Sequence, residues 1–263
     1  MAAQSFRRAG FALLLAACSA LCLAQSQQKA EPVYEPAEFQ PGKDVVWVPT
    51  PQVVVDKMLD LAKVTAKDFV IDLGSGDGRT VITAALRGAR ALGIEYNPEM
   101  IARSKRNAER NGVAGKAEFV KADLFETDFS KASVITMFLL PSINMKLRPK
   151  ILALKPVTRI VSNTFDMDDW LPDEKVTLGS DAGCNASWCT ALLWIVPAQV
   201  AGDYKLPQGD ISLKQRYQAL SGTLGKEGRT FEISGTVAGE EIYFTAGGRA
   251  YSGRKNGKSL ELR

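Results

Sequence analysis

The residues best suited to chemistry in this 263-residue chain are acidic side chains beside a glycine-rich segment. The segment Asp72–Gly78 reads Asp-Leu-Gly-Ser-Gly-Asp-Gly and follows a short apolar run. Glycines let a backbone turn tightly and approach a ligand closely, and the start of a following helix offers unpaired amide groups. A dinucleotide fingerprint would place its third glycine at position 79, which is Arg79. The loop instead has three glycines at alternate positions, with the acid Asp72 two residues before the first of them. An acidic side chain at this place favours a ligand with a cationic ammonium group over a pyrophosphate.

Two further carboxylates end the next two predicted strands. Glu95 closes the second strand, where a carboxylate can accept hydrogen bonds from both hydroxyls of a ribose. Asp123 follows the third strand and is placed to meet an adenine amine, with Leu124 adding apolar contact. The alternative is a plain turn at Gly74, a helix-capping Asp77 and solvated carboxylates. Because the loop and both acids fall at successive strand ends, we predict a nucleoside-cofactor site.

The composition excludes several other classes of site. The chain has no histidine, which rules out imidazole-based triads and histidine-containing metal sites. Its formal net charge is +4, and about +2 without the two leader arginines, so it lacks the strong positive charge of a general nucleic-acid binder. Outside the leader only Cys184 and Cys189 remain, too few ligands for a metal site, and we predict none. These two cysteines form either a disulfide that closes a short loop or two free thiols, and the sequence does not decide between the two states.

A sheet is needed to bring these residues together. Short apolar runs alternate with segments of helical spacing, which predicts an α/β fold with a doubly wound, mostly parallel, seven-stranded Rossmann-like sheet. Ligands of such sheets bind beyond the carboxyl ends of the strands. The predicted strands are 68–73, 89–95, 116–121, 133–140, 158–163, 174–178 and 190–196, and the predicted helices are 79–86, 98–110 and 143–154.

The first 24 residues have the layout of a secretory signal peptide. Arg7 and Arg8 precede a short apolar run that ends in small residues at Ala24. We expect cleavage after Ala24 and export to the periplasm or cell envelope. A lipobox ending at Cys18 would instead attach the chain to a membrane through a lipid, and an uncleaved anchor or mitochondrial presequence remains a further alternative.

The remaining chain divides into three predicted parts: an extended linker at 25–45, the α/β domain at 46–200 and a small C-terminal domain at 201–263. The last part has β-type residues broken by glycines at 211–224, 229–237, 241–246, 249–253 and 258–263. This pattern predicts a small antiparallel sheet or open barrel. This part is interpreted as a stabilising lid or dimerisation module, and the alternative is a role in substrate docking or envelope anchoring. The oligomeric state is not predicted.

The motif Val70–Gly78 resembles the first signature of the class I S-adenosylmethionine-dependent methyltransferases, and Glu95 and Asp123 resemble the second and third. A narrower resemblance is to the lysine methyltransferases of the ATP synthase c subunit and adenine nucleotide translocase and their bacterial relatives. That resemblance rests on VPTP at 48–51, LGSGDGR at 73–79, FLLPSIN at 138–144, LRPK at 147–150 and SNTFDMDDW at 162–170.

The resemblance implies S-adenosyl-L-methionine as cofactor and a methyltransferase sheet over 46–200. The expected cofactor-binding residues are Thr50, Pro51, Asp72, Gly74, Ser75, Gly76, Asp77, Gly78, Glu95, Asp123 and Leu124. Thr50 and Pro51 are expected to help close the site. The fourth strand ends in Leu-Leu-Pro rather than the Asn/Asp-Pro-Pro-Tyr of enzymes that methylate nucleic-acid bases or glutamine, so no nucleic-acid acceptor is expected.

An amine acceptor needs a burying, aromatic-walled approach, because desolvation lowers the amine's pKa and ring faces stabilise a methylammonium. Phe138, Phe165 and Trp170 lie at predicted strand-end loops and are candidates for that wall. Asn163 and Asp166 are candidates for orienting the amine, so Asn163, Phe165 and Asp166 form the predicted acceptor-positioning set. The alternative is that Phe165 and Trp170 are simply core.

The predicted function is methyl transfer to a protein lysine or other amine by direct in-line displacement, with a protein or small molecule as the acceptor. Two other interpretations stay open. The chain could bind S-adenosylmethionine as a non-catalytic scaffold or sensor, or it could methylate a small molecule or lipid of the envelope.

Overall fold

The computed structural model of the chain describes residues 34–257 and 259–263. The predicted signal peptide, its cleavage after Ala24 and the lipidation alternative at Cys18 lie outside these residues. Within the described part, no helix is both long and apolar enough to span a bilayer. Residues 36–263 form one unit that contains two sheets, and the first sheet positions the candidate site.

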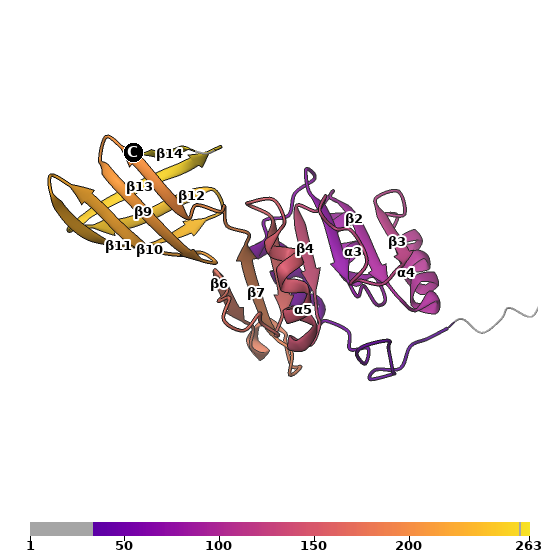
Figure 1. Cartoon of the computed structure of the whole chain (residues 1–263). Coiled ribbons are helices and arrows are strands. Elements are labelled where there is room, and N and C mark those ends of the chain that lie inside the picture. The colour runs from indigo at the N-terminus through magenta and orange to yellow at the C-terminus, as the bar shows by residue number, and fades with distance from the viewer. Residues whose placement is uncertain (1–33, 258) are drawn as a thin grey trace, which may run out of the picture. The chain divides into compact units, whose positions relative to one another are not determined.

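The first sheet has the strand order β3-β2-β1-β4-β5-β7-β6. The strands from β3 to β5 pair in parallel, whereas β7 is antiparallel to both β5 and β6. In Figure 1 the arrowheads of β2, β3 and β4 accordingly point to one edge and that of β7 to the other. The strands are β1 (Phe69–Leu73), β2 (Arg90–Glu95), β3 (Ala117–Lys121), β4 (Val134–Met137), β5 (Arg159–Asn163), β6 (Glu174–Thr177) and β7 (Thr190–Ile195). The predicted doubly wound, mostly parallel sheet is confirmed.

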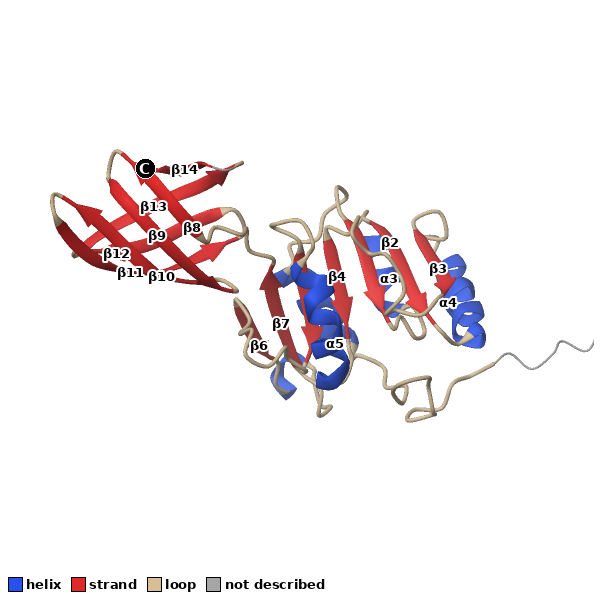
Figure 2. Ribbon diagram, in the orientation of Figure 1, coloured by secondary structure: helices blue, strands red, loops and turns tan. Residues whose placement is uncertain are grey.

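Helices cover both faces of this sheet, as Figure 2 shows for α5 in front and α3 behind. Alternate residues of each strand enter two separate cores: Val70 packs with α2, α3 and α4, whereas Ile71 packs with α5. Such double burial explains why the central strands are continuous apolar runs. The helices are α2 (Gln52–Leu61), α3 (Arg79–Leu86), α4 (Pro98–Arg110) and α5 (Pro141–Leu152), with a short 3₁₀ turn η1 (Ser180–Ala182).

The start of α4 shows how local sequence sets an element's boundary. The Asn97 side chain accepts a hydrogen bond from the Glu99 amide at 2.9 Å, and Pro98 occupies the first helical position. Proline suits that position because its missing N–H would have no intrahelical partner. The helix ends at Arg110, as predicted, and Asn111 and a left-handed Gly112 follow it.

The boundaries around β4 and α5 differ from the prediction. β4 stops at Met137 instead of running to position 140, and α5 begins at Pro141 instead of position 143. The apolar run 138–140 therefore forms a loop, and Pro141 starts the helix for the same reason as Pro98. Pro149 lies within α5, which continues past it because the buried Leu147 and Ile151 hold it against the sheet.

The second sheet is an antiparallel meander from β8 to β14 whose two edge strands approach each other, forming a near-barrel. Its strands are β8 (Gly202–Leu206), β9 (Gly209–Arg216), β10 (Ala219–Lys226), β11 (Arg229–Ala238), β12 (Glu241–Ala246), β13 (Arg249–Asn256) and β14 (Ser259–Leu262). The predicted antiparallel β domain is confirmed, but the strand predicted at 211–224 is two strands. The turn between them has a left-handed Tyr217 and no glycine to signal it.

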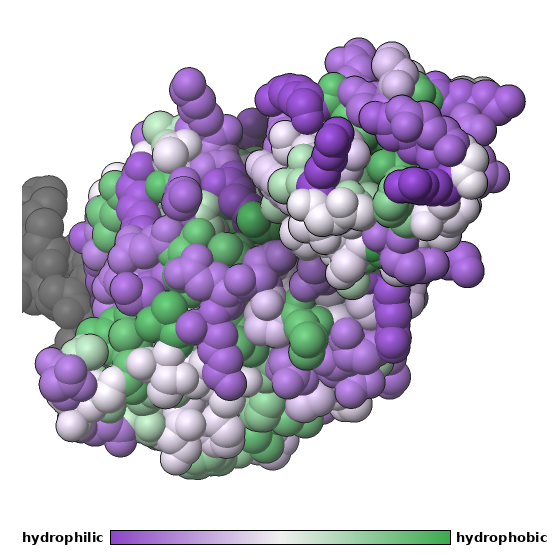
Figure 3. Space-filling model, turned by 90° about the vertical axis from the view of Figure 1, so that its left-hand side faces the viewer, coloured by the Kyte–Doolittle hydropathy of each residue, from purple (hydrophilic) through white to green (hydrophobic). Residues whose placement is uncertain are grey.

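Inward and outward side chains alternate along these strands, so Leu213, Ile233 and Phe244 fill a third core while their neighbours face solvent. On the face of the molecule turned toward the viewer in Figure 3, hydrophilic residues accordingly intermingle with smaller hydrophobic patches. One-sided burial of this kind is typical of antiparallel sheets.

Candidate active site

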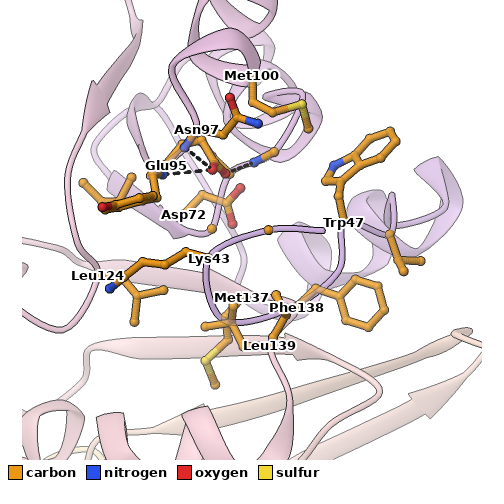
Figure 4. Close-up of a pocket in the computed structure, with 18 of the residues that line it drawn as sticks. Lys43, Trp47, Asp72, Glu95, Asn97, Met100, Leu124, Met137, Phe138 and Leu139 are labelled. Carbon is orange, nitrogen blue, oxygen red and sulfur yellow. Dashed lines mark hydrogen bonds between the residues drawn. The ribbon is translucent and has the colours of Figure 1, made fainter. Parts of the chain in front are cut away.

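A pocket lies where β1, β2, β3 and β4 end, and Figure 4 shows the side chains around it. Nine residues of the predicted cofactor set line it: Thr50, Asp72, Gly74, Ser75, Gly76, Asp77, Glu95, Asp123 and Leu124. Two residues of that set lie outside the lining. Pro51 is the N-cap of α2, and Gly78 is the N-cap of α3.

The loop between β1 and α3 depends on its glycines for both conformation and space. Gly76 and Gly78 have φ values of +53° and +84°, which favour glycine. A Cβ on Gly76 would lie 2.6 Å from the Trp47 indole nitrogen, and a Cβ on Gly78 would lie 2.8 Å from Phe119 and Ser104. Gly76 therefore lets the Trp47 indole approach the loop closely on the pocket side, whereas Gly78 lets the loop pack against α4 and β3.

Asp72 is a buried carboxylate at the end of β1. Its side chain accepts a hydrogen bond of 2.5 Å from the Thr136 hydroxyl on the neighbouring β4. Burial, with smaller contributions from the negative Glu95 and Asp77, raises the pKa of Asp72 to about 7. Loss of solvation disfavours the charged form, so a cation beside this carboxylate would restore its charge.

Glu95 is held by backbone amides at the end of β2. One carboxylate oxygen accepts from the Gly76 amide, and the other accepts from the amides of Tyr96 and Asn97, each at 2.9 Å. A carboxylate has about four lone-pair sites, so acceptor capacity remains for a ligand hydroxyl. The dashed lines in Figure 4 show this arrangement.

Asp123 is paired with a lysine that the sequence reasoning did not single out. Lys43 Nζ lies 2.5 Å from Asp123 Oδ2, and the Phe125 amide donates to the other oxygen at 2.9 Å. The hydrogen bond from Lys43 lowers the pKa of Asp123 and raises that of Lys43. Lys43 also lies 5.1 Å from the centre of the Tyr96 ring.

Lys43 belongs to a segment that we call the strap, residues 40–50, all of which line the pocket. Residues 40–45 of the strap fall in the stretch predicted as linker, where no local motif marked a site, whereas Thr50 at the end of the strap belongs to the predicted cofactor set. Arg79 connects it to the glycine loop: its guanidinium donates to the Thr50 carbonyl at 2.8 Å and pairs with Asp77 at 2.6 Å. Trp47 and Phe138 lie toward one end of the pocket, and Lys43 and Leu124 toward the other (Figure 4).

The predicted acceptor-positioning residues do not line this pocket, although they lie on an adjoining loop. Phe165 is half-buried and stacks on the pocket residue Phe138, with ring centres 5.8 Å apart. Asn163 is fully buried, with its amide 3.5 Å from the Thr50 hydroxyl. Asp166 is exposed and accepts from the Asp168 amide in its own turn.

Hydrogen bonds hold the Phe165 backbone. Its carbonyl accepts from the Ser162 hydroxyl at 2.7 Å and from the Asn144 amide at 3.3 Å. Asn144 belongs to the FLLPSIN segment and also donates to the Asp166 carbonyl at 3.0 Å. These bonds fix the turn after β5 and with it the direction of the Phe165 ring.

Trp170 belongs to the core. Its side chain has no exposed surface and packs against Trp194 and Tyr217, with ring centres 6.3 and 5.9 Å apart. A different tryptophan, Trp188, lies beside Phe138 and Phe165. Sequence reasoning missed it because Trp188 precedes a strand instead of following one, and only the antiparallel direction of β7 brings it to this edge.

Trp188 lies in a loop closed by a disulfide between Cys184 and Cys189, whose Cα atoms are 6.0 Å apart. Of the two possibilities that the sequence left open, the bridge is the one found. Among the described residues, no group of three or more cysteine, aspartate or glutamate side chains is placed to hold a metal ion.

The pocket suits a nucleoside with a cationic substituent. Acidic side chains occur at three successive strand ends, and the buried Ser75 hydroxyl has no hydrogen-bond partner within the described residues. A buried hydroxyl without a partner is costly unless a ligand or water supplies one. Together these groups fit an adenosine moiety with an ammonium-bearing side chain.

Comparison with known proteins agrees with this geometry. The ANTKMT methyltransferase domain matches residues 72–174. A protein-lysine N-methyltransferase of Saccharolobus islandicus (strain REY15A) is 49% identical over 135 residues, which are 50% of this chain and 84% of that protein. The human lysine N-methyltransferase of the ATP synthase c subunit is 37% identical over 113 residues, 43% of this chain, and the match spans only 48% of that protein.

A solved structure from Salinibacter ruber, described as an RNA methyltransferase in complex with S-adenosyl-L-homocysteine, is 46% identical, with a TM-score of 0.54. The match covers 59% of this chain and 98% of that one. Sequence, fold and pocket thus agree, and the chain belongs to the S-adenosylmethionine-dependent methyltransferases, in the family of the ANTKMT methyltransferase domain and its protein-lysine N-methyltransferase relatives.

Proposed function

We propose that this methyltransferase acts on lysine side chains of a protein. The observation that carries the proposal is the half-buried aromatic pair Phe138 and Phe165, which continues from the cofactor pocket along the carboxyl edge of the sheet. Relatives described as protein-lysine N-methyltransferases support the same acceptor. An aromatic surface next to the reactive methyl group suits a nucleophile that becomes a methylammonium.

The cofactor-binding roles follow the order of the strands. Asp123 and Leu124 after β3 receive the adenine, Glu95 at the end of β2 receives the ribose, and the loop after β1 receives the methionine part. Asp72, Gly74, Ser75, Gly76 and Asp77 form that last subsite. Thr50 closes it from the strap, while Pro51 and Gly78 act indirectly by setting the starts of α2 and α3.

The chain's own residues mainly align and desolvate the reactants. S-adenosylmethionine supplies an activated methyl group, which the acceptor nitrogen takes as the carbon–sulfur bond breaks and sulfur keeps the electron pair. Phe138 and Phe165 shield the lysine from water, which lowers the pKa of its ammonium and promotes proton loss to solvent before attack. Asn163 positions Thr50, and the turn containing Asp166 positions Phe165. Such alignment contributes about 7–11 kcal/mol to lowering a reaction barrier.

A methyl-transfer assay tests the proposal. The whole enzyme is incubated with S-adenosylmethionine labelled in its methyl group and with envelope and membrane extracts. We expect label in protein that protease removes and ribonuclease does not, with mass spectrometry locating it on lysine. Label that only ribonuclease or lipid extraction removes would replace the lysine with a nucleic acid or lipid acceptor.

We further propose that the enzyme works outside the cytoplasm. The leader pattern at 1–24 and the Cys184–Cys189 disulfide support this location, because disulfides persist mainly in oxidising compartments. The mature N-terminus, read by mass spectrometry from the native host, distinguishes cleavage before Gln25 from lipidation at Cys18. An unprocessed Met1 would contradict export.

A further inference from the structure

Three aromatic rings, not two, form the surface beside the cofactor pocket. Trp188 lies 5.9 Å from Phe138 and 5.6 Å from Phe165 between ring centres, and the two phenylalanines lie 5.8 Å apart. We call these three residues the aromatic wall. All three residues are half-buried, so none of them is enclosed as a core residue is. A fully packed core would not leave three adjoining rings in this state.

The order of the strands places this wall on the acceptor side of the pocket. Along the sheet edge, the expected adenine and ribose positions lie at β3 and β2, and the methionine position lies at β1. β4 and β5, which lead into Phe138 and Phe165, come next, followed by the start of β7 just after Trp188. The reactive methyl group would thus lie between the nucleoside and the aromatic wall.

No cation of the described residues makes a cation–π contact with the aromatic wall. Seven cation–π contacts occur in the part of the chain that the structure describes, and they involve Phe69, Tyr96, Phe125, Phe129 and Tyr217. None of them involves Phe138, Phe165 or Trp188. An external ammonium can therefore contact these rings without displacing a lysine or arginine of the described residues from a cation–π contact.

The loop that contains Trp188 is held at both ends. The buried Cys184 and Cys189 are bridged, and the Cys189 carbonyl accepts from the Leu178 amide at 2.8 Å. The loop residues 185–187 are exposed. Because Trp188 directly precedes a bridged cysteine, the disulfide restricts how far its indole can move from Phe165.

We propose that Trp188 is an acceptor-binding residue whose indole contacts the lysine ammonium and its methylated forms, and that the Cys184–Cys189 disulfide positions it. The proposal rests on the proposed lysine methylation and adds the residue and the constraint that select a cationic side chain. Cation–π contact predicts tighter binding of a quaternary ammonium than of a neutral group of equal size.

Binding measured by NMR tests the contact without turnover. The sample is the ¹⁵N-labelled enzyme saturated with S-adenosylhomocysteine, and its four tryptophans each give an indole N–H signal. The signal that is missing in Trp188→Phe belongs to Trp188. The probe is Nα-acetyl-Nε-trimethyllysine methylamide, and its neutral carbon analogue with a tert-butyl group is the control. We expect the Trp188 signal to shift with the cation and far less with the analogue, while the buried Trp194 signal stays in place. Equal shifts with both compounds, or none at Trp188, would overturn the proposal.

Variants measure the size of the effect through the probe's dissociation constant. Trp188→Ala should weaken probe binding about 3- to 30-fold, and Trp188→Phe should retain most of the affinity. Ser187→Ala, an exposed residue of the same loop, is the matched control and should bind normally. Affinity for S-adenosylhomocysteine should stay within about twofold in all three, because Trp188 lies outside the cofactor pocket. Normal probe binding by Trp188→Ala would refute the assignment.

A double-mutant cycle tests the role of the disulfide as a positioning element. Cys184→Ser/Cys189→Ser should weaken probe binding in the wild-type background and change nothing further in Trp188→Ala. Wild-type enzyme reduced with dithiothreitol gives the same comparison if the serine pair folds poorly. Fully additive losses would show that the bridge acts on general stability and not through Trp188.

The two proposals can fail separately. If the enzyme labels lysine but Trp188→Ala binds the probe normally, only the present inference is wrong. If the label is found on RNA while the Trp188 signal still responds to the cation, the lysine function is wrong and the cation site stands.

Discussion

At the residue scale, the three pocket acids at the strand ends, Asp72, Glu95 and Asp123, have different surroundings. Asp72 is buried beside Thr136, Glu95 is bound by three backbone amides, and Asp123 is paired with Lys43. Burial removes the hydration of Asp72 and raises its pKa to about 7. The three residues should therefore respond differently to pH and to substitution.

We expect cofactor affinity to depend on pH through Asp72. Its pKa of about 7 lies above the ordinary 3.8, so the free enzyme binds an extra proton below neutrality. A cationic cofactor favours the charged carboxylate, and its dissociation constant should rise by up to about tenfold per pH unit below pH 7. Calorimetry in buffers of different ionisation enthalpy should detect proton release on binding, and Asp72→Asn should abolish it.

The same shift predicts a change in the stability of the free enzyme. A carboxyl group whose pKa is raised on folding contributes most to the free energy of unfolding at low pH. That contribution is lost as the pH rises from about 4 to about 7. Asp72→Asn removes this titration, so its urea unfolding should depend less on pH than that of the wild type over this window. An identical pH dependence in both proteins would mean that Asp72 is already charged.

Glu95→Gln should lower cofactor affinity about 10- to 100-fold, because a carboxylate acceptor for the ribose is replaced by an amide. The glutamine NH₂ group would also face backbone amides that need an acceptor. Glu99→Gln, an exposed neighbour on α4, is the charge-matched control and should bind normally. Isothermal titration with S-adenosylhomocysteine measures both, and equal affinity in the two variants would remove Glu95 from the ribose site.

At the element scale, the site depends on how closely loops approach the strand ends. The β1–α3 loop lies against α4 and β3 at Gly78, and the strap lies against the same loop at Gly76 through Trp47. The β5–β6 loop is fixed by Asn144 of α5. The two close contacts of the β1–α3 loop depend on glycines at positions 76 and 78, and the β5–β6 loop depends on the polar side chain of Asn144.

Gly78→Ala should destabilise the enzyme by about 2–4 kcal/mol, because it adds a Cβ in a left-handed conformation and 2.8 Å from Phe119 and Ser104. Gly112→Ala is the matched control: its φ is +69° and nothing lies within 4 Å of the added carbon. It should cost only about 1–2 kcal/mol of backbone strain. Urea denaturation of both variants separates strain from overlap, and equal losses would refute the packing argument.

At the scale of the whole molecule, side chains of the second sheet contact the loop after β5. Asp169 accepts from Arg148 of α5, from Arg216 of β9 and from the Tyr217 hydroxyl. The hydrogen bond from Arg216 is the main cause that lowers the pKa of Asp169 to about 2. The Tyr217 ring also stacks on the buried Trp170. None of these residues lines the cofactor pocket, so this junction supports the fold more directly than the chemistry.

Tyr217→Ala should therefore lower the free energy of unfolding by about 2 kcal/mol through lost packing, and leave cofactor affinity unchanged. Tyr243→Ala, on β12 with 47% of its side chain exposed, is the control and should change stability by about 0.5 kcal/mol or less. Chemical denaturation and titration with S-adenosylhomocysteine measure the two effects. A loss of cofactor affinity in Tyr217→Ala would instead link the second sheet to the site.

Much of the fold follows from local signals that act over a few residues. Buried apolar runs predict β1 and β2, and the Asn-Pro pair predicts the start of α4. Where packing overrides such signals, prediction is poorer. α5 runs through Pro149 because the sheet holds it, and β9 and β10 are separated by a left-handed tyrosine that no turn motif announces.

The sequence alone predicted that Asp72, Glu95 and Asp123 gather at one edge of the sheet, because parallel strands must bring their carboxyl ends together. All three line the pocket found there. Only the tertiary structure decided which aromatic residues adjoin the site. The sequence pointed to Trp170 for the acceptor wall and not to Trp188, but Trp170 turns into the core. The antiparallel β7 and the disulfide instead bring Trp188 to Phe138. The direction of a strand and the partner of a cysteine are long-range choices, made by packing between segments distant in the chain.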